Sequence, residues 1–359
     1  MELFEPYRFG QLMLRNRFIR SATWDHSADT DGKVTEASLA IYSGLSKGNI
    51  GLIISGFAFV SSSGQAVDGQ YGVHDDRMLS GLRKLARTAH GDGSKIALQI
   101  VHAGISAWGH IETAMAVSEV VHVNRLHREM TEENIESIIK DFAVAAMRAK
   151  EAGFDAVQLH GAHGYLMSQF LSPVLNRRTD RWGGSLENRS RFHLEVIRRI
   201  RQEIGKDFPL LIKFGIQDDL AHGLTLEEGV RVAGWMVNEG IDSIEVSAGV
   251  GGVAIPHLKP GETERVVFRA RSAALKKAIN ISVMLVGGIR SLDMCEEIIN
   301  SGDADMISMC RPFICEPDLL KRWQSGDRKP AKCISCSLCI KCAREGQLLE
   351  CRTIHPLNR

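Results

Sequence analysis

The sequence predicts an α/β fold, a (β/α)₈ TIM barrel that carries a short Cys-rich appendage at its C-terminal end. Eight strand-like apolar runs recur at regular intervals, and helical patterns lie between them. That number of strand–helix units in a chain of this length is typical of the barrel. A doubly wound open sheet is the competing fold, but no Gly-x-Gly-x-x-Gly turn opens the chain.

Most of the eight runs are continuously apolar rather than alternating, as expected of parallel strands that are covered on both faces. In chain order they are 17–23, 51–60, 95–104, 155–164, 210–218, 243–249, 282–289 and 304–311. In such a barrel the chemistry lies on the loops that follow the strands, so residues at strand C-terminal ends are the first functional candidates.

Two helices are marked by their start signals. In 131–152 an apolar stripe at helical spacing follows Thr131, which can act as an N-cap. A second helix begins at Thr225, with Glu228 at the spacing of a capping box. Several helices are followed by a glycine, which predicts a left-handed stop at Gly48, Gly153, Gly205 and Gly240.

Composition narrows the function classes. With a formal net charge of +1, 44% hydrophobic and 24% charged residues, the chain gives no electrostatic case for nucleic acid or a membrane surface. It has no spanning apolar run or signal peptide, and we expect a cytoplasmic protein. Residues 1–325 are expected to form the barrel, with the appendage at 326–359 and the long connection 106–130, which holds three histidines, covering part of the site.

Three chemically active side chains follow the fourth strand run, in the sequence VQLHGAHGY. His160, His163 and Tyr165 stand within six residues of one another at this strand end. Neutral imidazoles can hold a carbonyl oxygen on which negative charge develops, and a phenol can deliver a proton to carbon. A lone histidine here would more simply bond to loop backbone, but three such groups favour a catalytic site for enolate chemistry.

The same segment carries a resemblance to a known family. HGAHGYLMSQFLSP followed by NRRTDRWGGSLENRSRF, residues 160–192, resembles the signature of the old yellow enzyme family of FMN-dependent NADH:flavin oxidoreductases and ene-reductases. Trp182 stands where tyrosine is usual. The resemblance extends over the whole barrel, which resembles the barrel domain of the 2,4-dienoyl-CoA reductase branch.

The resemblance implies an FMN lying across the open end of the barrel. Gln99 matches the glutamine that pairs with the flavin pyrimidine edge, and Lys213 matches the cation near flavin N1 and O2. A lysine inside an apolar strand is costly without a negative partner, which supports that role. The remaining implied contacts are Ser21, Ala22 and Thr23 to the ring, Gly287, Gly288, Cys310 and Arg311 to the phosphate, and Trp24 in the substrate pocket.

The implied activity is reduction of the C=C bond of α,β-unsaturated carbonyl compounds, with NADH or NADPH as hydride donor. His160 and His163 would hold the substrate carbonyl and Tyr165 would protonate the α-carbon. The family also implies a homo-oligomer that acts on a small molecule. Trp24 is larger than the residues usual at its position, so it can stack on substrate, narrow the pocket or simply fill the core.

The Cys-rich end allows several interpretations. Cys333, Cys336 and Cys339 form C-x₂-C-x₂-C, and Cys351 follows. This spacing suits a [4Fe-4S] cluster and resembles the cluster motif of the same branch. Zinc, or a metal-free remnant, are the alternatives, and Cys342 is surplus.

Other function classes stay open at this point. With a cluster, the protein would oxidise an amine or another donor and pass electrons to a partner protein. A catalytically idle electron-transfer or docking barrel, and a Schiff-base aldolase using Lys213, are further alternatives.

Overall fold

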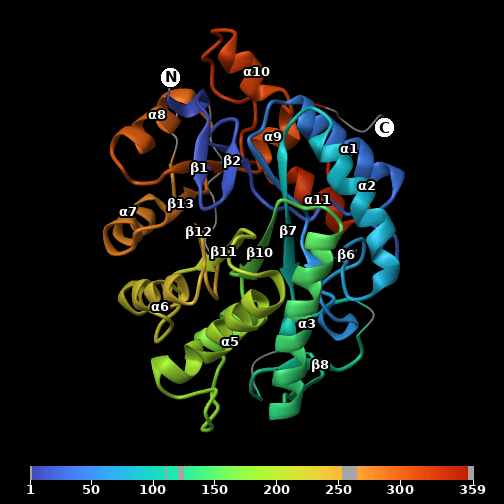
Figure 1. The fold of residues 1–359 in the computed structure, drawn as a ribbon, viewed down its shortest axis with the longest axis vertical. Coiled ribbons are helices and arrows are strands. Elements are labelled where there is room, and N and C mark those ends of the chain that lie inside the picture. Colours follow the sequence, from blue (N-terminus) through green and yellow to red (C-terminus); the bar gives the residue numbers. More distant parts are fainter. Residues whose placement is uncertain (1, 110, 120–124, 253–264, 355–359) are drawn as a thin grey trace.

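The computed structural model describes residues 2–109, 111–119, 125–252 and 265–354. Its main sheet is a closed barrel of parallel strands in the order β10-β11-β12-β13-β14-β3-β4-β7, and β10 also pairs with β7 to complete the circle. Figure 1 looks along this barrel and shows the helices following one another around it in chain order. The TIM barrel predicted from the sequence is confirmed.

All eight predicted strand runs contain a barrel strand, although each strand is shorter than its run. The barrel strands are β3 (Phe18–Arg20), β4 (Leu52–Ile54), β7 (Lys95–Val101), β10 (Ala156–Gly161), β11 (Leu210–Gly215), β12 (Ser243–Ser247), β13 (Ser282–Leu285) and β14 (Met306–Met309). The two-residue strands β5 (Ala58–Phe59) and β6 (Tyr71–Gly72) extend the sheet beside β7.

Helices cover the outside of the barrel. They are α1 (Glu36–Lys47), α2 (Leu79–His90), α3 (Glu132–Glu151), α4 (Leu166–Leu171), α5 (Leu186–Ile204), α6 (Leu226–Asn238), α7 (Arg269–Ala278), α8 (Leu292–Asn300), α9 (Arg311–Cys315) and α10 (Leu319–Gln324). A further helix, α11 (Leu338–Arg344), belongs to the Cys-rich segment.

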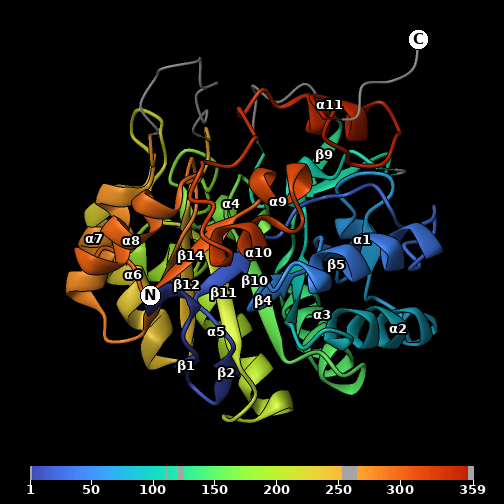
Figure 2. The same ribbon diagram turned by 90° about the horizontal axis from the view of Figure 1, so that it is seen from above.

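Alternate residues of each strand face into the barrel or out towards the helices. On β3, Ile19 belongs to the cluster that fills the barrel, whereas Phe18 packs with the outer helices. The inner cluster is closed at one end by an antiparallel hairpin of β1 (Tyr7–Phe9) and β2 (Leu12–Leu14), which adds Phe9, Leu12 and Leu14. Figure 2 shows this hairpin at one end of the barrel and α11 at the other. The open end is therefore the one where the strands finish, as the barrel fold predicts for a site.

The predicted helix starts are confirmed, and one predicted helix stop is wrong. Thr131 and Thr225 each form a full capping box, at the starts of α3 and α6. Gly48, which follows α1, has φ −73°, and the left-handed residue is Asn49, at φ 65°. Gly48 is small for a different reason, because a Cβ there would come within 1.9 Å of the Pro317 carbonyl oxygen.

The long connection after β7 contributes a short parallel pair, β8 (Ala114–Ala116) and β9 (His127–Glu129), and β9 lies at the same end of the molecule as α11 (Figure 2). Two of its three histidines, His110 and His122, lie outside the described residues. The division into a barrel at 1–325 and an appendage at 326–359 stays a prediction. Tail and barrel do touch, for example where the Ala331 amide donates to the Arg290 carbonyl (2.8 Å).

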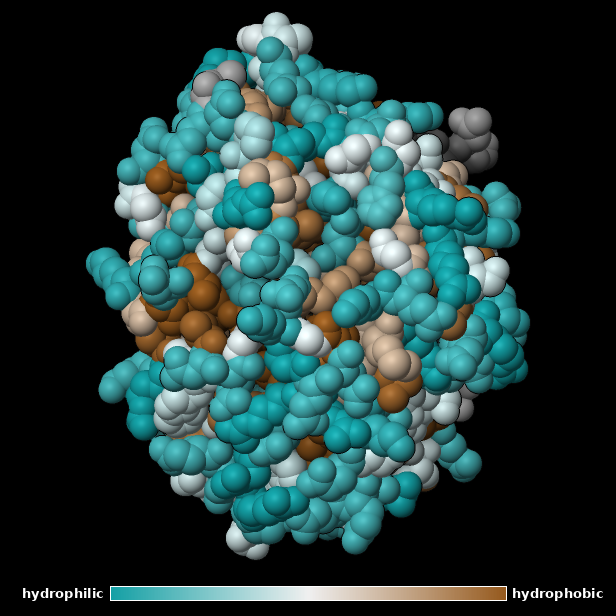
Figure 3. Space-filling model, viewed as in Figure 1, coloured by the Kyte–Doolittle hydropathy of each residue, from teal (hydrophilic) through white to brown (hydrophobic). Residues whose placement is uncertain are grey.

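The surface at the end closed by the hairpin is mostly hydrophilic. Figure 3 views this end and shows polar side chains over most of it, with apolar side chains gathered towards the left of the view. Among the described residues, no helix has both the length and the apolar character needed to cross a membrane.

Candidate active site

Strand register brings several predicted site residues into one row at the open end of the barrel. His160 on β10 is the register partner of Lys213 on β11, and Lys213 is the partner of Glu245 on β12. The other neighbour of β10 is β7, where Gln99 is the register partner of Gln158. Because parallel strands in register carry partner side chains to the same level, these polar groups meet inside the rim.

The three predicted catalytic side chains form one cluster. The ring of His160 lies edge-on to both His163 and Tyr165, with centroid distances of 5.0 and 4.8 Å. Phe57 packs against His160 and Tyr165 at 6.0 and 5.6 Å. His163 adopts a left-handed backbone conformation, at φ 61°, and its Nε2 lies 2.7 Å from Ser247 Oγ on β12. Backbone strain of this kind is common at functional sites.

Burial keeps the two imidazoles neutral. It lowers the pKa of His160 well below its ordinary value, with His163 and Lys213 adding to the effect. Burial and Lys213 lower the pKa of His163 to about 4, against a smaller opposing effect of Glu245. The Ala162 amide donates to His160 Nδ1 (3.4 Å), so the proton of the neutral ring belongs on Nε2. That nitrogen is then a hydrogen-bond donor without a full charge.

The phenol of Tyr165 is also held in its protonated form. Burial raises its pKa to about 12, and the guanidinium of Arg344, at the end of α11, offsets part of that rise. Tyr165 packs in the same apolar cluster as Phe57 and Trp24. The arrangement therefore offers two neutral donors for an oxyanion and one protonated phenol beside them.

Lys213 has the negative partner that its burial requires. Its Nζ lies 2.7 Å from Glu245 Oε2 and donates to Ser21 Oγ at 2.9 Å, and both side chains of the ion pair are almost fully buried. Gln99 Nε2 donates to Gln158 Oε1 at 2.7 Å. Gln158 Nε2 in turn donates to Glu245 Oε2 at 2.9 Å. Gln99 and Lys213, the two residues predicted at the flavin pyrimidine edge, therefore belong to one buried polar network.

The predicted phosphate-binding residues line one pocket after β13 and β14. Gly287, Gly288, Cys310 and Arg311 all contribute to it. Both glycines have positive φ, 108° and 96°, and a Cβ on Gly287 would come within 2.9 Å of the Phe268 ring. Only glycine satisfies both demands. Arg311 donates to the Ser335 carbonyl (3.2 Å), so it is held at the boundary between this pocket and the Cys-rich segment.

The loop after β3 places Ser21, Ala22 and Thr23 between the barrel interior and that pocket. Ala22 packs on the inner barrel cluster, and Thr23 Oγ1 lies 2.8 Å from Cys310 Sγ. Trp24 uses its indole N–H on the Asp68 carbonyl (3.0 Å), so this donor is engaged within the protein. Its ring packs both on the cluster of Tyr165 and on the cluster of Cys339 in α11.

These groups fit FMN. A flat ring with a polar pyrimidine edge would meet the buried amide of Gln99 and the ammonium of Lys213. Its phosphate would meet the glycine-lined pocket and the Arg311 guanidinium, a donor set suited to a dianion. The cluster of His160, His163 and Tyr165 stands at the same rim.

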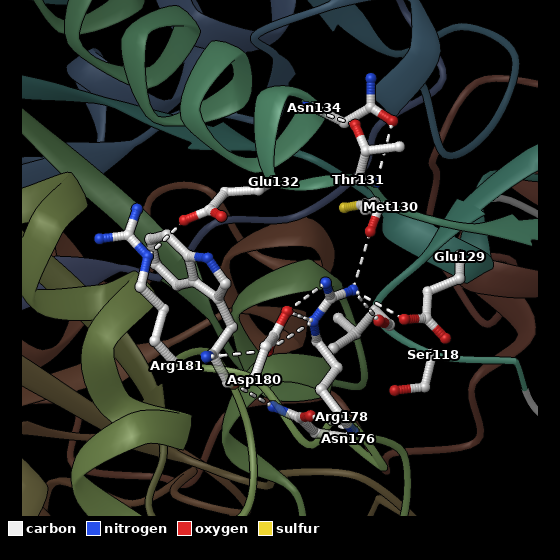
Figure 4. A network of polar contacts seen from close by, with 12 residues as sticks. Ser118, Glu129, Met130, Thr131, Glu132, Asn134, Asn176, Arg178, Asp180 and Arg181 are labelled. Carbon is white, nitrogen blue, oxygen red and sulfur yellow. Dashed lines mark hydrogen bonds and ion pairs between the residues drawn. The ribbon is translucent and has the colours of Figure 1, made fainter.

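The second half of the signature segment has a different environment. Arg178 donates to the carbonyls of Val117 (2.9 Å) and Met130 (2.8 Å), and it pairs with Asp180 (2.6 Å) and Glu129 (3.1 Å). Figure 4 shows the carboxylates of Asp180 and Glu129 and the backbone carbonyl of Met130 around this guanidinium. Trp182 is fully buried, and the neighbouring Arg181 guanidinium lies over its ring. This half ties the long connection 106–130 to the barrel.

The four cysteines of the predicted cluster line a single small cavity, together with Arg311 and Arg352. They are Cys333, Cys336, Cys339 and Cys351. Cys342 lies outside that lining, and its sulfur accepts from Arg352 Nε (2.9 Å). Among the described residues no three His, Cys, Asp or Glu groups are close enough to hold one metal ion. Four thiolates are a ligand set for either a zinc ion or a [4Fe-4S] cluster.

Sequence reasoning missed several residues that the structure brings to this site: Phe57, Gln158, Glu245, Ser247 and Arg344. Glu245 had a usable signal, because a carboxylate inside the apolar run SIEVSAG is as costly as the lysine in LLIKFG. Phe57 and Arg344 had none, since they reach the site only through tertiary packing.

Comparison with known proteins identifies the relatives of this chain. It is 37% identical over 99% of its length to an NADH oxidase from Thermoanaerobacter brockii, of which it spans 56%. It is 34% identical over 88% of its length to an NADPH dehydrogenase from Clostridium acetobutylicum, of which it spans 93%. The chain therefore covers about half of the first relative and nearly all of the second.

Solved structures agree with these relatives. A 2-naphthoyl-CoA reductase in complex with 2-naphthoyl-CoA superimposes with a TM-score of 0.90 at 29% identity, covering 98% of this chain and 56% of that one. A histamine dehydrogenase from Rhizobium sp. 4-9 gives 0.86 at 25%, covering 98% and 52%. Morphinone reductase in complex with tetrahydroNAD gives 0.77 at 26%, covering 91% of both chains.

The model of the NADH:flavin oxidoreductase / NADH oxidase family matches residues 2–329. The resemblance seen in the signature segment is thereby confirmed. This chain belongs to the NADH:flavin oxidoreductase / NADH oxidase family.

Proposed function

We propose that this chain reduces the C=C bond of α,β-unsaturated carbonyl compounds. The observation that carries the proposal is the cluster of two neutral imidazoles and one protonated phenol beside the polar row at the barrel rim. FMN, when bound, supplies the hydride carrier between NADH or NADPH and the substrate. The residues of this chain position the substrate and handle the proton.

His160 and His163 would hold the substrate carbonyl oxygen. The free Nε2–H of His160 donates to it directly. For His163 the suitable tautomer has Nε2 accepting from the Ser247 hydroxyl, which leaves the proton on Nδ1. As negative charge develops on that oxygen, both N–H groups stabilise it. Neither ring has to change its protonation state first, because both are already neutral.

Tyr165 would give the proton to the α-carbon. An enolate is a strong enough base to take a proton from a phenol whose pKa is about 12. Arg344 stands near enough to favour the phenolate that the transfer leaves behind. The aromatic wall of Phe57 and Trp24 keeps the cluster partly out of water.

The decisive experiment separates the two half-reactions in a Tyr165→Phe variant. Reduction of the flavin by NADH or NADPH is expected to stay close to that of the unaltered protein. Reoxidation by an enone is expected to slow by about 10²–10⁴-fold, the usual contribution of a general acid. Equal losses in both half-reactions would contradict the role of Tyr165, and a protein that cannot be loaded with FMN would contradict the proposal itself.

The cavity lined by four cysteines favours a second candidate, a donor-oxidising flavoprotein that exports electrons through a [4Fe-4S] cluster to a partner protein. The similarity to histamine dehydrogenase supports it. Iron and acid-labile sulfide in protein purified without oxygen are the expected result. Cys336→Ser should remove both, and Cys342→Ser, outside the cavity lining, should retain them. Iron-free protein that still reduces enones would exclude this candidate.

A further inference from the structure

Glu245 is the most highly engaged buried carboxylate of the candidate site. Its side chain is fully buried on β12. Oε1 accepts from the hydroxyls of Ser21 and Ser308, each at 2.7 Å. Oε2 accepts from Gln158 Nε2 at 2.9 Å and lies 2.7 Å from Lys213 Nζ. All of the carboxylate's close partners are donors, so its position and its charge are both fixed.

The carboxylate is ionised beside its lysine. Burial raises the pKa of Glu245, but the charge of Lys213 and the hydrogen bonds from Lys213, Ser308 and Ser21 outweigh that effect, and the net shift is downward. The pair therefore carries no net charge. A cofactor bound beside this row would meet an ammonium whose field is largely cancelled by the carboxylate 2.7 Å away.

The same carboxylate orients the amide of Gln99 through an intermediary. Glu245 accepts only, so Gln158 must turn its NH₂ group towards it. The carbonyl oxygen of Gln158 then faces Gln99, which must present its own NH₂ group. No described residue donates to Gln99 Oε1, so that oxygen is left as the acceptor for a ligand N–H.

We propose that Glu245 is a positioning residue that sets the reduction potential of bound FMN. It holds Lys213 and, through Gln158, Gln99 at the pyrimidine edge, and it lowers the potential by cancelling the charge of Lys213. A free cation beside the ring would favour the anionic reduced flavin, whereas a neutral pair favours it less. The inference rests on the proposed binding of FMN at this rim.

The test is the midpoint potential of FMN in the loaded protein, measured by spectroscopic titration, with the FMN dissociation constant measured in parallel. Glu245→Gln keeps the shape of the side chain and leaves Lys213 uncompensated, so the potential is expected to shift upward. Asp242→Asn is the matched control. It makes the same chemical change before the other end of β12, where Asp242 pairs with Arg201 (2.6 Å), and it should leave the potential unchanged.

A second pair of variants covers the case in which Glu245→Gln does not fold. Lys213→Met leaves the carboxylate unopposed and is expected to lower the potential. Lys213→Met combined with Glu245→Gln removes both charges and should return it close to that of the unaltered protein. Loaded variants that all share one potential would overturn the inference while leaving the proposed function intact. Failure of the unaltered protein to bind FMN would overturn both.

Discussion

The two halves of the signature segment differ in how their polar groups are satisfied. In the first half, His160 and Tyr165 contact each other mainly through ring edges, and no described residue accepts a hydrogen bond from His160 Nε2. In the second half, the guanidinium of Arg178 is bonded to two backbone carbonyls and two carboxylates of the same chain. One stretch of sequence thus combines a candidate catalytic cluster with a structural anchor.

This difference teaches that a motif can identify a family even where its residues have a structural role and take no part in the chemistry. The second half is part of the same signature segment, yet its polar groups hold the chain in place. Substitutions in the two halves should therefore fail in different ways. Substitutions in the first half should lower activity and leave stability nearly unchanged. Substitutions in the second half should lower stability and leave the activity per folded molecule nearly unchanged.

After Tyr165→Phe, the largest effect is expected from His163→Ala. Loss of one oxyanion donor should lower kcat/KM for an enone by about 10²–10³-fold. His163→Asn should retain much of the activity, because asparagine tolerates the left-handed backbone at φ 61° and its amide can donate. Steady-state kinetics on both variants, with thermal melting as the control for folding, measure this. Alanine and asparagine variants of equal activity would contradict the donor role.

Arg178→Ala should lower the free energy of unfolding by about 3 kcal/mol, because the carbonyls of Val117 and Met130 lose a charged donor. Arg181→Ala is the control. Its side chain is 53% exposed and pairs with Glu132 and Glu136, so its loss should cost no more than about 1 kcal/mol. Urea unfolding of both variants gives the comparison. Equal costs would mean that the second half is no anchor.

A smaller effect is expected at the start of α5. Ser185 caps this helix by accepting from the Asn188 amide at 3.3 Å. Ser185→Ala should lower the free energy of unfolding by about 1 kcal/mol, and Ser185→Gly by only a few tenths. Enone reduction per folded molecule should be unchanged in both. A selective loss of kcat would assign chemistry to the second half.

The smallest effect is expected from pH. The pKa of His163 is lowered to about 4 and that of Tyr165 is raised to about 12, so neither group titrates between about pH 6 and 9, and enone reoxidation should be nearly flat there. Below this range the unfolded histidine takes up a proton near its ordinary pKa of about 6.5 while the folded one does not. Stability should therefore fall as pH drops from about 6.5 to 4. A rate that changes tenfold within the flat window would contradict the assignment.

The fold was largely predictable because periodicity reports burial directly. Continuous apolar runs marked all eight barrel strands, and cap residues marked the starts of α3 and α6. The helix stop at Gly48 was wrong because its glycine is demanded by the close Pro317 carbonyl, a contact between distant parts of the chain. Contacts between distant parts of the chain leave no periodic pattern in the sequence.

The candidate site was predictable where a polar or charged side chain stands at a position that costs free energy unless a partner or a function compensates for it. His160 and His163 at a strand end, and Lys213 inside a strand, are of this kind, and the structure gathers them at one rim. Glu245 obeys the same rule and could have been paired with Lys213. The approach of Arg344 to Tyr165 depends on how α11 docks, which no local pattern encodes.

The position of Trp24 limits where the chain can be truncated. Its indole forms part of the wall beside Tyr165 and also the seat on which Cys339 and its neighbours rest. A truncation placed where the family match ends, at residue 329, would strip one side of that ring. The shortened barrel would then expose one face of the indole to water beside Tyr165, so properties measured on it would not be those of the full chain.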